Sequence, residues 1–424
     1  MPKILNMGRA VVCGLCATVL GLALVATSPQ VACGQPALAV DSIGQALVEN
    51  HPGGAVIGLL RGDTTAVHAF GAVDSTGRRP TARTLFEMGS ITKTFTGLLL
   101  ADAIERGEVG RSTSVTTLLP DSVTVGTTDS TTMTLGHLAT HRSGLPRLPS
   151  NLGATARPGD PYAAYGDSAL YAFLDDYTLS RAPGAKYEYS NLGMGLLGQL
   201  LARRADTTYA ALVRRRITGP LGLPDTRVHH SPERADRFAQ GHDRMGRPTP
   251  PWHFEALAGA GALRSTAADL LTYLRAHRHA LEAASGTTLA LQQAMRRALR
   301  PRAPTGRDST RVGLGWHQST RDGHAVLWHN GGTGGFRSVV ALDRETGDGV
   351  VVLVSAALSS RTVLKTGRAL LRALRPHCAA RPSSPPPSLT TRPARPPSHP
   401  RSRHPPRRPP PSHQRLPPTP QPTP

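Results

Sequence analysis

The chain has 424 residues, of which 39% are hydrophobic and 4% aromatic, and its formal net charge at pH 7 is +21. This composition excludes a wholly disordered chain, a collagen and a coiled coil, and a single long apolar run argues against a polytopic membrane protein. No cysteine lies between residues 34 and 377. That part of the chain therefore has no disulfide, no thiolate zinc site and no cysteine nucleophile.

The first 39 residues have the pattern of an export signal. Lys3 and Arg9 form a positive region, an apolar run over residues 10–26 follows, and small residues come next. We expect residues 1–39 to be a signal peptide or a membrane anchor, and cleavage, lipidation at Cys33 and retention as an anchor all stay open. In each case we expect the globular part to lie outside the cytoplasm, either in the periplasm or secreted. Attachment to the membrane through the N-terminus is one of these outcomes.

Hydrophobic periodicity predicts the secondary structure of the globular part, residues 40–375. The pattern indicates an α+β fold, in which about residues 40–110 and 290–375 form an antiparallel sheet flanked by helices and about residues 111–289 form a mostly helical insertion. The expected elements are, in chain order, a helix over 41–51, strands over 55–60 and 65–72, helices over 92–106, 191–205, 209–218 and 267–277, strands over 325–328, 336–343 and 349–355, and a helix over 361–374.

Residues 376–424 differ in composition from the rest of the chain. They hold 8 arginines, no Asp or Glu, and 19 of the 38 prolines. Such a segment cannot bury a core, so we expect a disordered Pro/Arg-rich tail. Three interpretations stay open: a polycationic arm for anionic envelope polymers or nucleic acid, a solvated tail, and a GC-rich gene read out of frame after about Arg375.

The first candidate catalytic pair is Ser90 and Lys93, at the start of the helix expected over 92–106. Residues three apart face the same side of a helix, with about 5–6 Å between their Cβ atoms. A serine hydroxyl is a weak nucleophile until a base takes its proton, and a lysine amine can do this if burial lowers its pKa. Only four of the 49 basic residues are lysines, and arginine does not deprotonate in proteins.

The second candidate set is Tyr189-Ser190-Asn191. A phenol held beside cations can be partly deprotonated and shuttle a proton, and an asparagine amide can donate to a substrate carbonyl and orient a lysine. Because Tyr189 and Asn191 are two residues apart on an extended or turning segment, both can point into one cleft. Tyr187 is a rival for the same role, and a packed tyrosine in a loop is the alternative.

The third candidate is the glycine-rich segment over residues 329–336, between two predicted strands. Glycines within strands let another backbone approach closely, and a free N–H there can act as an oxyanion donor. A phosphate-binding loop requires a Lys-Ser/Thr ending and a following helix, and both are missing. A plain glycine turn remains the alternative.

In order and spacing, these three segments resemble the serine β-lactamase superfamily with the penicillin-binding proteins, and most of all its class C branch with DD-peptidase and esterase relatives. Phe86 before Gly89-Ser90 and four further segments match the same pattern, at 138–146, 219–223, 261–266 and 313–316. The resemblance covers about residues 41–374. It implies an exported serine hydrolase that forms an acyl-enzyme on amide or ester bonds, as a DD-carboxypeptidase, a β-lactamase or an esterase.

The resemblance also implies roles for individual residues. Ser90 is the expected acylated nucleophile, Lys93 and Tyr189 are the proton-transfer partners, and which of the two is the base stays open. Asn191 is expected to orient Lys93 and the substrate amide.

The third segment is expected to bind the substrate at the place where the family has a Lys-Thr-Gly strand. The N–H groups of Ser90 and Gly332 are the expected oxyanion hole. Three neighbouring residues are expected to contact the substrate, namely Asn330, Gly331 and Thr333. The expected substrate is a small molecule or peptide with an acyl group (a peptidoglycan stem peptide, a β-lactam or an ester), and no cofactor, metal or specific nucleic acid is expected.

His329 departs from the β-lactamase pattern, because it occupies the place of the lysine in that strand. Lysine is a fixed cation that can hold a substrate carboxylate, whereas histidine is neutral for much of the time near pH 7. The change leaves the serine chemistry intact but argues against efficient β-lactam hydrolysis. It favours DD-peptidase and esterase activities, whose enzymes often carry His-x-Gly.

Other functional classes fit the sequence less well. An envelope-binding protein with the same fold and weak or no catalysis is the main alternative. A metallohydrolase would use the histidines of His277-x-His279 or His229-His230, but residues two apart face different sides of a helix and no His-Glu-x-x-His motif exists. An α/β-hydrolase lacks its Gly-x-Ser-x-Gly turn, and a nucleic-acid-binding protein rests on charge alone.

Overall fold

The computed structural model describes residues 36–126, 131–283, 289–307, 309–321 and 323–375. The predicted tail and nearly all of the predicted export signal lie outside these residues. Among the described residues, none of the helices has the length and apolar character needed to cross a membrane.

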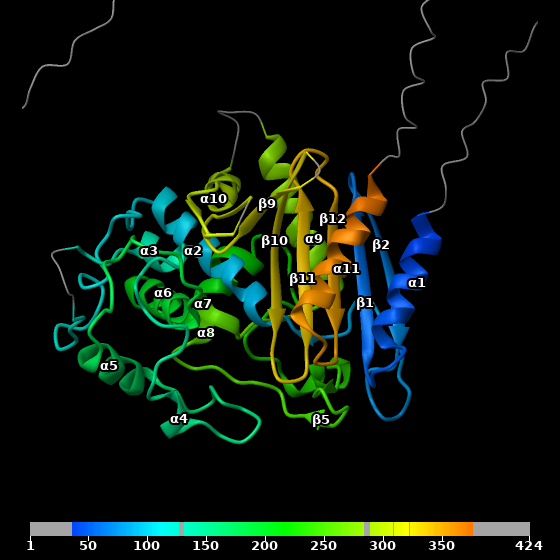
Figure 1. Cartoon of the computed structure of the whole chain (residues 1–424), viewed down its shortest axis with the longest axis horizontal. Helices are drawn as coiled ribbons and strands as arrows, with labels where there is room; N and C mark the ends of the chain where they lie inside the picture. Colours follow the sequence, from blue (N-terminus) through cyan, green and yellow to red (C-terminus); the bar gives the residue numbers. More distant parts are fainter. Residues whose placement is uncertain (1–35, 127–130, 284–288, 308, 322, 376–424) are drawn as a thin grey trace, which may run out of the picture. The chain divides into compact units, whose positions relative to one another are not determined.

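An eight-stranded antiparallel sheet is built from both ends of the described chain (Figure 1). Its strands follow the order β2-β1-β12-β11-β10-β9-β8-β7, so β1 pairs with β12 although about 300 residues separate them. The strands are β1 (Gly54–Arg61), β2 (Thr64–Gly71), β7 (Ala303–Pro304), β8 (Thr310–Val312), β9 (His317–Arg321), β10 (His324–Gly332), β11 (Arg337–Asp343) and β12 (Gly349–Val354).

Helices cover both faces of the sheet. The inner strands β1, β11 and β12 are buried along almost their whole length, which explains their continuous Val, Ile and Leu sequences. On one face α1 (Pro36–Val48) and α11 (Ser360–Leu374) pack against these strands, and on the other face α9 (Ala267–Glu282) does so. The sheet and the helices on its two faces make the α+β architecture expected from the sequence.

The rest of the described chain consists of helices and short strands joined by long loops. Its helices are α3 (Leu135–Ala139), α4 (Leu152–Thr155), α5 (Asp167–Asp176), α6 (Asn191–Arg204), α7 (Tyr209–Val213), α8 (Ala258–Gly261) and α10 (Ala290–Leu299), with helical turns at Arg214–Thr218 and Pro232–Arg237. Its strands are β3 (Phe86–Glu87) with β6 (Arg264–Ser265), and β4 (Gly241–His242) with β5 (Pro248–Thr249).

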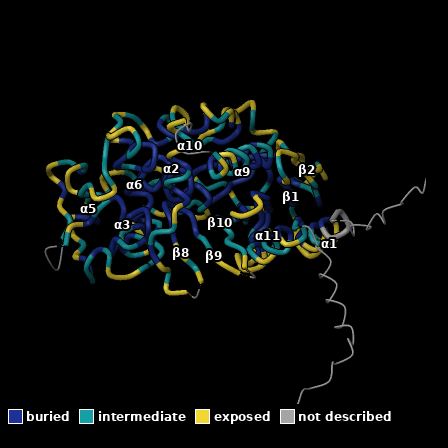
Figure 2. The backbone as a smooth tube through the Cα atoms, turned by 90° about the horizontal axis from the view of Figure 1, so that it is seen from above, coloured by how far each residue is buried: buried dark blue, intermediate teal, exposed yellow. Residues whose placement is uncertain are grey.

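The helix α2 (Thr92–Glu105) lies in the middle of the protein. Residues 92–103 are all buried, and the helix packs against α6, α8 and α10 (Figure 2). A Cβ at Gly97 would lie 2.1 Å from the carbonyl oxygen of Leu314, so this glycine lets the helix touch the loop before β9. The turn Gly89–Ile91 leads into α2, and it is fixed by the pairing of β3 with β6 and by contact with β10. Ser90 therefore stands on a rigid, buried element.

The sequence predicts most of these elements within a few residues. Two differences concern the site: the strand expected over 325–328 continues through the glycines to residue 332, and β7 to β9 were not predicted. The helix expected over 209–218 is an α-helix followed by a π-helical turn over Arg214–Thr218.

Candidate active site

The hydroxyl of Ser90 and the amine of Lys93 are within hydrogen-bond distance. Lys93 Nζ lies 3.1 Å from Ser90 Oγ and donates a hydrogen bond of 2.6 Å to the carbonyl oxygen of Ala260. The lysine side chain is fully buried, and this burial, helped by the nearby positive charge of Arg147, lowers the pKa of Lys93 well below its ordinary value of 10.5. The amine therefore loses its proton much more readily than an ordinary lysine, and in its neutral form it has a lone pair with which to accept the proton of Ser90.

Tyr189 contacts the same pair from the opposite wall. Its hydroxyl is hydrogen-bonded to Ser90, and Lys93 Nζ lies 5.0 Å from the centre of its ring. Burial raises the pKa of Tyr189 to about 12, although the bond with Ser90 and the charge of Arg147 oppose that rise. The structure thus differs from the expectation of a partly deprotonated phenol: the group is protonated near neutral pH and acts as a proton donor.

Local hydrogen bonds explain why Tyr189 faces Ser90. Ser190 is the N-cap of α6, and its hydroxyl accepts from the N–H of Gly193 and donates to the carbonyl of Pro146. Its own N–H donates to Nδ1 of His141, whose ring lies 4.5 Å from that of Tyr189. Helix capping and the 138–146 segment together fix the direction of the tyrosine.

Asn191 lies beside this group but does not bind Lys93. Its side chain is hydrogen-bonded to the hydroxyl of Tyr162, and its buried Oδ1 has no hydrogen-bond partner among the described residues. The group that holds the lysine amine is the carbonyl of Ala260. Asn191 is thus near enough to contribute an amide to the site, but the expected orientation of Lys93 by Asn191 is absent.

The end of β10 forms the wall next to Ser90. A Cβ at Gly331 would lie only 2.0 Å from the carbonyl oxygen of Met88, and one at Gly89 would lie 2.6 Å from the nitrogen of Gly332. The hydroxyl of Ser338 on β11 donates to the same Met88 carbonyl at 2.8 Å. The glycines therefore let the backbone around Ser90 touch the strand, which is the function that the sequence predicts for glycines here.

Residues 329–332 have an open edge. On one side they pair with β11, whereas on the other side β9 begins at His317, opposite Trp328, and pairs with none of them. An open strand edge offers backbone N–H and C=O groups to a ligand. This edge faces the cleft in which Ser90 lies.

His329 is a neutral hydrogen-bond acceptor in this site. Its side chain is 1% exposed, and burial lowers its pKa well below 6.5. Nδ1 lies 2.8 Å from the carbonyl oxygen of Asn330, and because a carbonyl only accepts, Nδ1 carries the proton. Nε2 is then an acceptor, and it has no partner among the described residues. His329 therefore cannot supply the positive charge of the lysine that the family pattern has here.

A cleft of about 890 Å³ joins these groups. It is lined by Ser90, Tyr189, His329, Asn330, Gly331, Gly332 and Thr333 among the predicted residues, while Lys93 and Asn191 lie behind its wall. Five arginines also line it: Arg147, Arg307, Arg321, Arg337 and Arg368. Among the described residues that line the cleft, none is Asp or Glu. The three histidines near Ser90 are neutral, because burial lowers the pKa of His141, His317 and His329, so the arginines make the cleft positive.

Two of these arginines stand close to the reacting groups and were not singled out from the sequence. Arg147 lies 5.1 Å from the centre of the Tyr189 ring. Arg337 is held by three backbone carbonyls: Nε donates to Leu358, and Nη1 donates to Thr333 and Phe336, each at 2.7 Å. Its Nη2 has no partner among the described residues, so two N–H groups remain for a ligand. Each of the two arginines lies in or beside a segment that matches the family pattern. The chain has many arginines, however, and the residue type alone does not distinguish these two.

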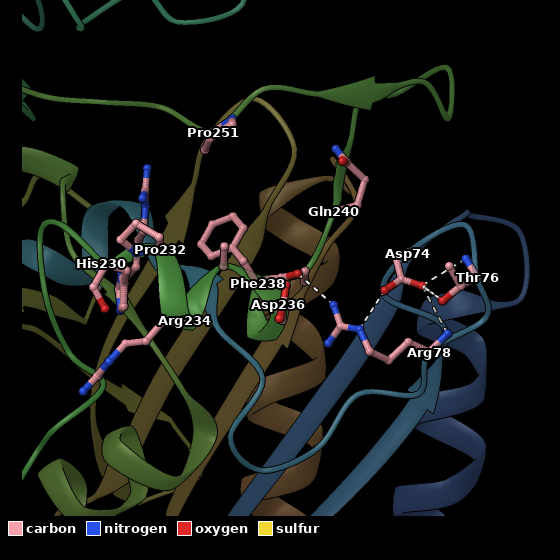
Figure 3. A pocket seen from close by; sticks show the side chains of 14 residues that line it. Asp74, Thr76, Arg78, His230, Pro232, Arg234, Asp236, Phe238, Gln240 and Pro251 are labelled. Carbon is pink, nitrogen blue, oxygen red and sulfur yellow. Dashed lines mark hydrogen bonds and ion pairs between the residues drawn. The ribbon is translucent and has the colours of Figure 1, made fainter.

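Two other groups of residues offer weaker evidence for a functional site. His324, Asp343 and Glu345 lie within ligand distance of a common point, but Asp343 is already paired with Arg375 at 2.9 Å. A second pocket, of about 720 Å³, is lined by several charged groups that already have ion-pair partners, such as Asp74 with Arg78 and Arg234 with Asp225 (Figure 3). We therefore assign the chemistry to the cleft at Ser90.

The fold and the site define a class of protein. A serine hydroxyl beside a neutral amine and a phenol, in an open cleft next to a strand edge, is the arrangement of a serine hydrolase. The family model described as "Beta-lactamase" matches residues 40–374. The chain belongs to this family, and it is a serine hydrolase of the β-lactamase and DD-peptidase type that acts through an acyl-enzyme.

Three relatives show the range of the family. The chain is 28% identical to "D-alanyl-D-alanine-carboxypeptidase/endopeptidase AmpH" of Escherichia coli K12, covering 67% of this chain and 74% of the relative. It is 24% identical to a "Beta-lactamase" of Pseudomonas fluorescens, covering 79% of this chain and 98% of the relative. It is 27% identical to "Penicillin-binding protein 4*" of Bacillus subtilis, covering 55% of this chain and 54% of the relative.

A solved structure confirms the fold. A "Beta-Lactamase/D-Alanine Carboxypeptidase" from Pseudomonas syringae superposes with a TM-score of 0.67 at 22% identity, covering 79% of this chain and 99% of that one. The predicted α+β architecture of the β-lactamase and transpeptidase type is therefore correct.

Proposed function

We propose that this chain is an exported serine peptidase that cleaves an amide bond next to a carboxylate in acyl-D-alanyl peptides. The observation that carries the proposal is the 3.1 Å contact between Ser90 Oγ and the buried Lys93 Nζ at the wall of an open, positive cleft. Relatives named carboxypeptidases support the substrate class, and the leader-like pattern of residues 1–39 supports export.

The geometry supports a definite sequence of proton transfers. Neutral Lys93 takes the hydroxyl proton of Ser90 as Oγ forms a bond to the substrate carbonyl carbon. The N–H groups of Ser90 and Gly332 stabilise the oxyanion, each by about 3–4 kcal/mol. Protonated Tyr189 then donates its proton to the leaving nitrogen, the amide C–N bond breaks, and the Lys93 proton returns to the phenol through the site. Water releases the acyl group by the reverse transfers.

A covalent adduct with penicillin tests this assignment. The β-lactam carbonyl should acylate Ser90, because the nucleophile, base and donors are those of the peptide reaction. Mass spectrometry of the full chain after incubation should show one added penicillin mass, located on the peptide that contains Ser90. An adduct on another residue, or none at all, would favour the non-catalytic envelope-binding protein.

Arg337 is the cation that we expect to hold the substrate carboxylate in place of the strand lysine. Its fixed guanidinium has free N–H groups in the cleft next to Gly332, and hydrogen bonds to charged groups contribute about 1.5–3 kcal/mol. Arg337→Met should therefore raise KM for an acyl-D-Ala-D-Ala carboxylate about 10- to 100-fold, while leaving kcat/KM for its C-terminal amide almost unchanged.

Arg244 provides the matched control for that experiment. It is exposed, does not line the cleft, and is near enough for its charge to lower the pKa of Arg337. Arg244→Met should leave the preference for the carboxylate intact. Equal losses on both substrates in Arg337→Met would mean that the arginine only supports the loop at Thr333.

A further inference from the structure

The cleft continues away from Ser90 onto a second positive area around Trp328. The indole ring of Trp328 stacks on His317, with ring centres 4.8 Å apart, and Arg368 of α11 lies 5.5 Å from the indole. Trp328, His317, Arg321 and Arg368 line the same cleft as Ser90. We call Arg321, Trp328 and Arg368 the distal shelf.

The distal shelf is too far from Ser90 to contact the reacting bond. Trp328 precedes Gly332 by four residues on β10, and at about 3.3 Å per residue this is about 13 Å along the strand. On α11 the residues Ser360, Leu364 and Arg368 recur every four positions and form the other wall of the cleft. A ligand that reaches from Gly332 to Arg368 must therefore be extended by three or four residue lengths.

The positive charge of the distal shelf is uncompensated among the described residues. Burial and the repulsion of Arg321 and Arg372 both lower the pKa of Arg368. Helix α11 contains no Asp or Glu, and no described carboxylate forms an ion pair with Arg368. Asp308 and Asp322 follow Arg307 and Arg321 in the sequence and lie outside the described residues, whereas the residues that flank Arg368 in the sequence, Gly367 and Ala369, are uncharged. An anionic ligand group would remove this repulsion.

A row of aromatic rings connects Tyr189 to the distal shelf. Tyr189, the proton donor in the proposed reaction, is near His329, with ring centres 6.4 Å apart. His329 in turn contacts His317, at 5.2 Å between ring centres, and His317 stacks on Trp328. These rings run from the proposed proton donor to Trp328, and Arg368 lies against the indole at the far end.

We propose that the distal shelf binds a second carboxylate, carried by the leaving half of an extended peptide substrate. This inference rests on the proposed function and narrows it: the substrate has one carboxylate beside the scissile amide, at Arg337, and another about 13 Å away. The enzyme then prefers branched or cross-linked anionic peptides over those that release a single amino acid.

A pair of branched peptides tests the proposal. Each is N-acetyl-D-Ala-D-Lys with a free α-carboxylate, and its ε-amine is acylated by the C-terminal carboxyl of acetyl-Gly-Glu in one and of acetyl-Gly-Gln in the other, so that the two differ only in the side-chain carboxylate. The wild-type full chain should cleave the Glu peptide with a kcat/KM about tenfold higher than the Gln peptide, and Arg368→Met should bring the ratio close to one. A wild-type ratio near one, or an unchanged ratio in Arg368→Met, would overturn the proposal.

Lys365 offers the matched control. It is exposed, lies on α11 within one turn of Arg368, and does not line the cleft, so Lys365→Met should keep the tenfold preference. A misfolded Arg368→Met protein would also lose activity on a small neutral ester. In that case Arg368→Lys, which retains the positive charge, provides a second variant and should keep a preference for the Glu peptide. Binding of the two peptides to the Ser90→Ala full chain can be measured by calorimetry, which needs no catalysis. Tighter binding of the Glu peptide there would support carboxylate binding at the distal shelf even if the proposed reaction were wrong. Equal binding of the two peptides would contradict carboxylate binding at the distal shelf.

Discussion

Replacing Ser90 with alanine should lower kcat/KM on an acyl-D-alanyl substrate by about 10⁴- to 10⁶-fold and abolish the penicillin adduct. Without the hydroxyl no acyl-enzyme forms, and only the binding and oxyanion groups remain to accelerate a direct attack by water. The measurement is steady-state hydrolysis of one D-Ala-D-Ala peptide and one neutral ester by both proteins. A variant that kept near-full activity on either substrate would show that Ser90 is not the nucleophile.

The fold of the Ser90→Ala variant should be intact, which makes the comparison direct. The side chain is only partly buried, and its hydrogen-bond partners Lys93 and Tyr189 retain other contacts with Ala260 and Arg147. We expect the midpoint of urea unfolding to shift by no more than the loss of one hydrogen bond, about 1 kcal/mol. Ser112→Ala, at an exposed position, is the control that should change neither activity nor stability.

The sequence contained enough information for the local elements of the site but not for its surroundings. The Ser90–Lys93 spacing on a helix and the glycines at 331–332 carry their geometry within a few neighbouring residues, and each was placed as expected. The strands β7 to β9 were missed because they are short and polar, and their pairing with β10 depends on residues that the pattern of one segment does not reveal.

The groups that tune the site come from the tertiary structure. Lys93 is held by the backbone carbonyl of Ala260, a group that every residue type possesses and that no motif can mark. The protonation of Tyr189 follows from its burial, which raises its pKa to about 12, and burial is decided by elements distant in the sequence. For the same reason the spacing could not distinguish Arg147 and Arg337 from the many other arginines of the chain.

One electrostatic arrangement connects these observations. A positive cleft attracts an anionic substrate, but a charged lysine within it could not accept a proton. Burial of Lys93 separates the two requirements: the arginines carry the charge at the cleft surface, and the lowered pKa of the buried amine favours its neutral form. Arg147 contributes to both requirements, because its charge makes the cleft more positive and also lowers the pKa of Lys93.

Replacing Lys93 with methionine should abolish most of the activity and, at the same time, change how stability depends on pH. Loss of the base should lower kcat/KM by about 10²- to 10⁴-fold. In the wild type, the folded pKa of Lys93 is well below its ordinary value of 10.5, so between these two values the unfolded chain binds one more proton than the folded chain. The free energy of unfolding of the wild type should therefore rise with pH, relative to the variant, by about 1.4 kcal/mol per pH unit.

The difference between the two proteins isolates this one group, because all other titrating residues are shared. Urea unfolding of wild type and Lys93→Met at half-unit steps from about pH 7 to about pH 11.5 gives that difference, and it should level off above about pH 10.5, where the unfolded lysine also loses its proton. Lys186→Met, at an exposed lysine, should run parallel to the wild type throughout. Parallel curves for Lys93→Met as well would mean that the amine is charged in the folded protein, and a charged amine cannot be the base that activates Ser90.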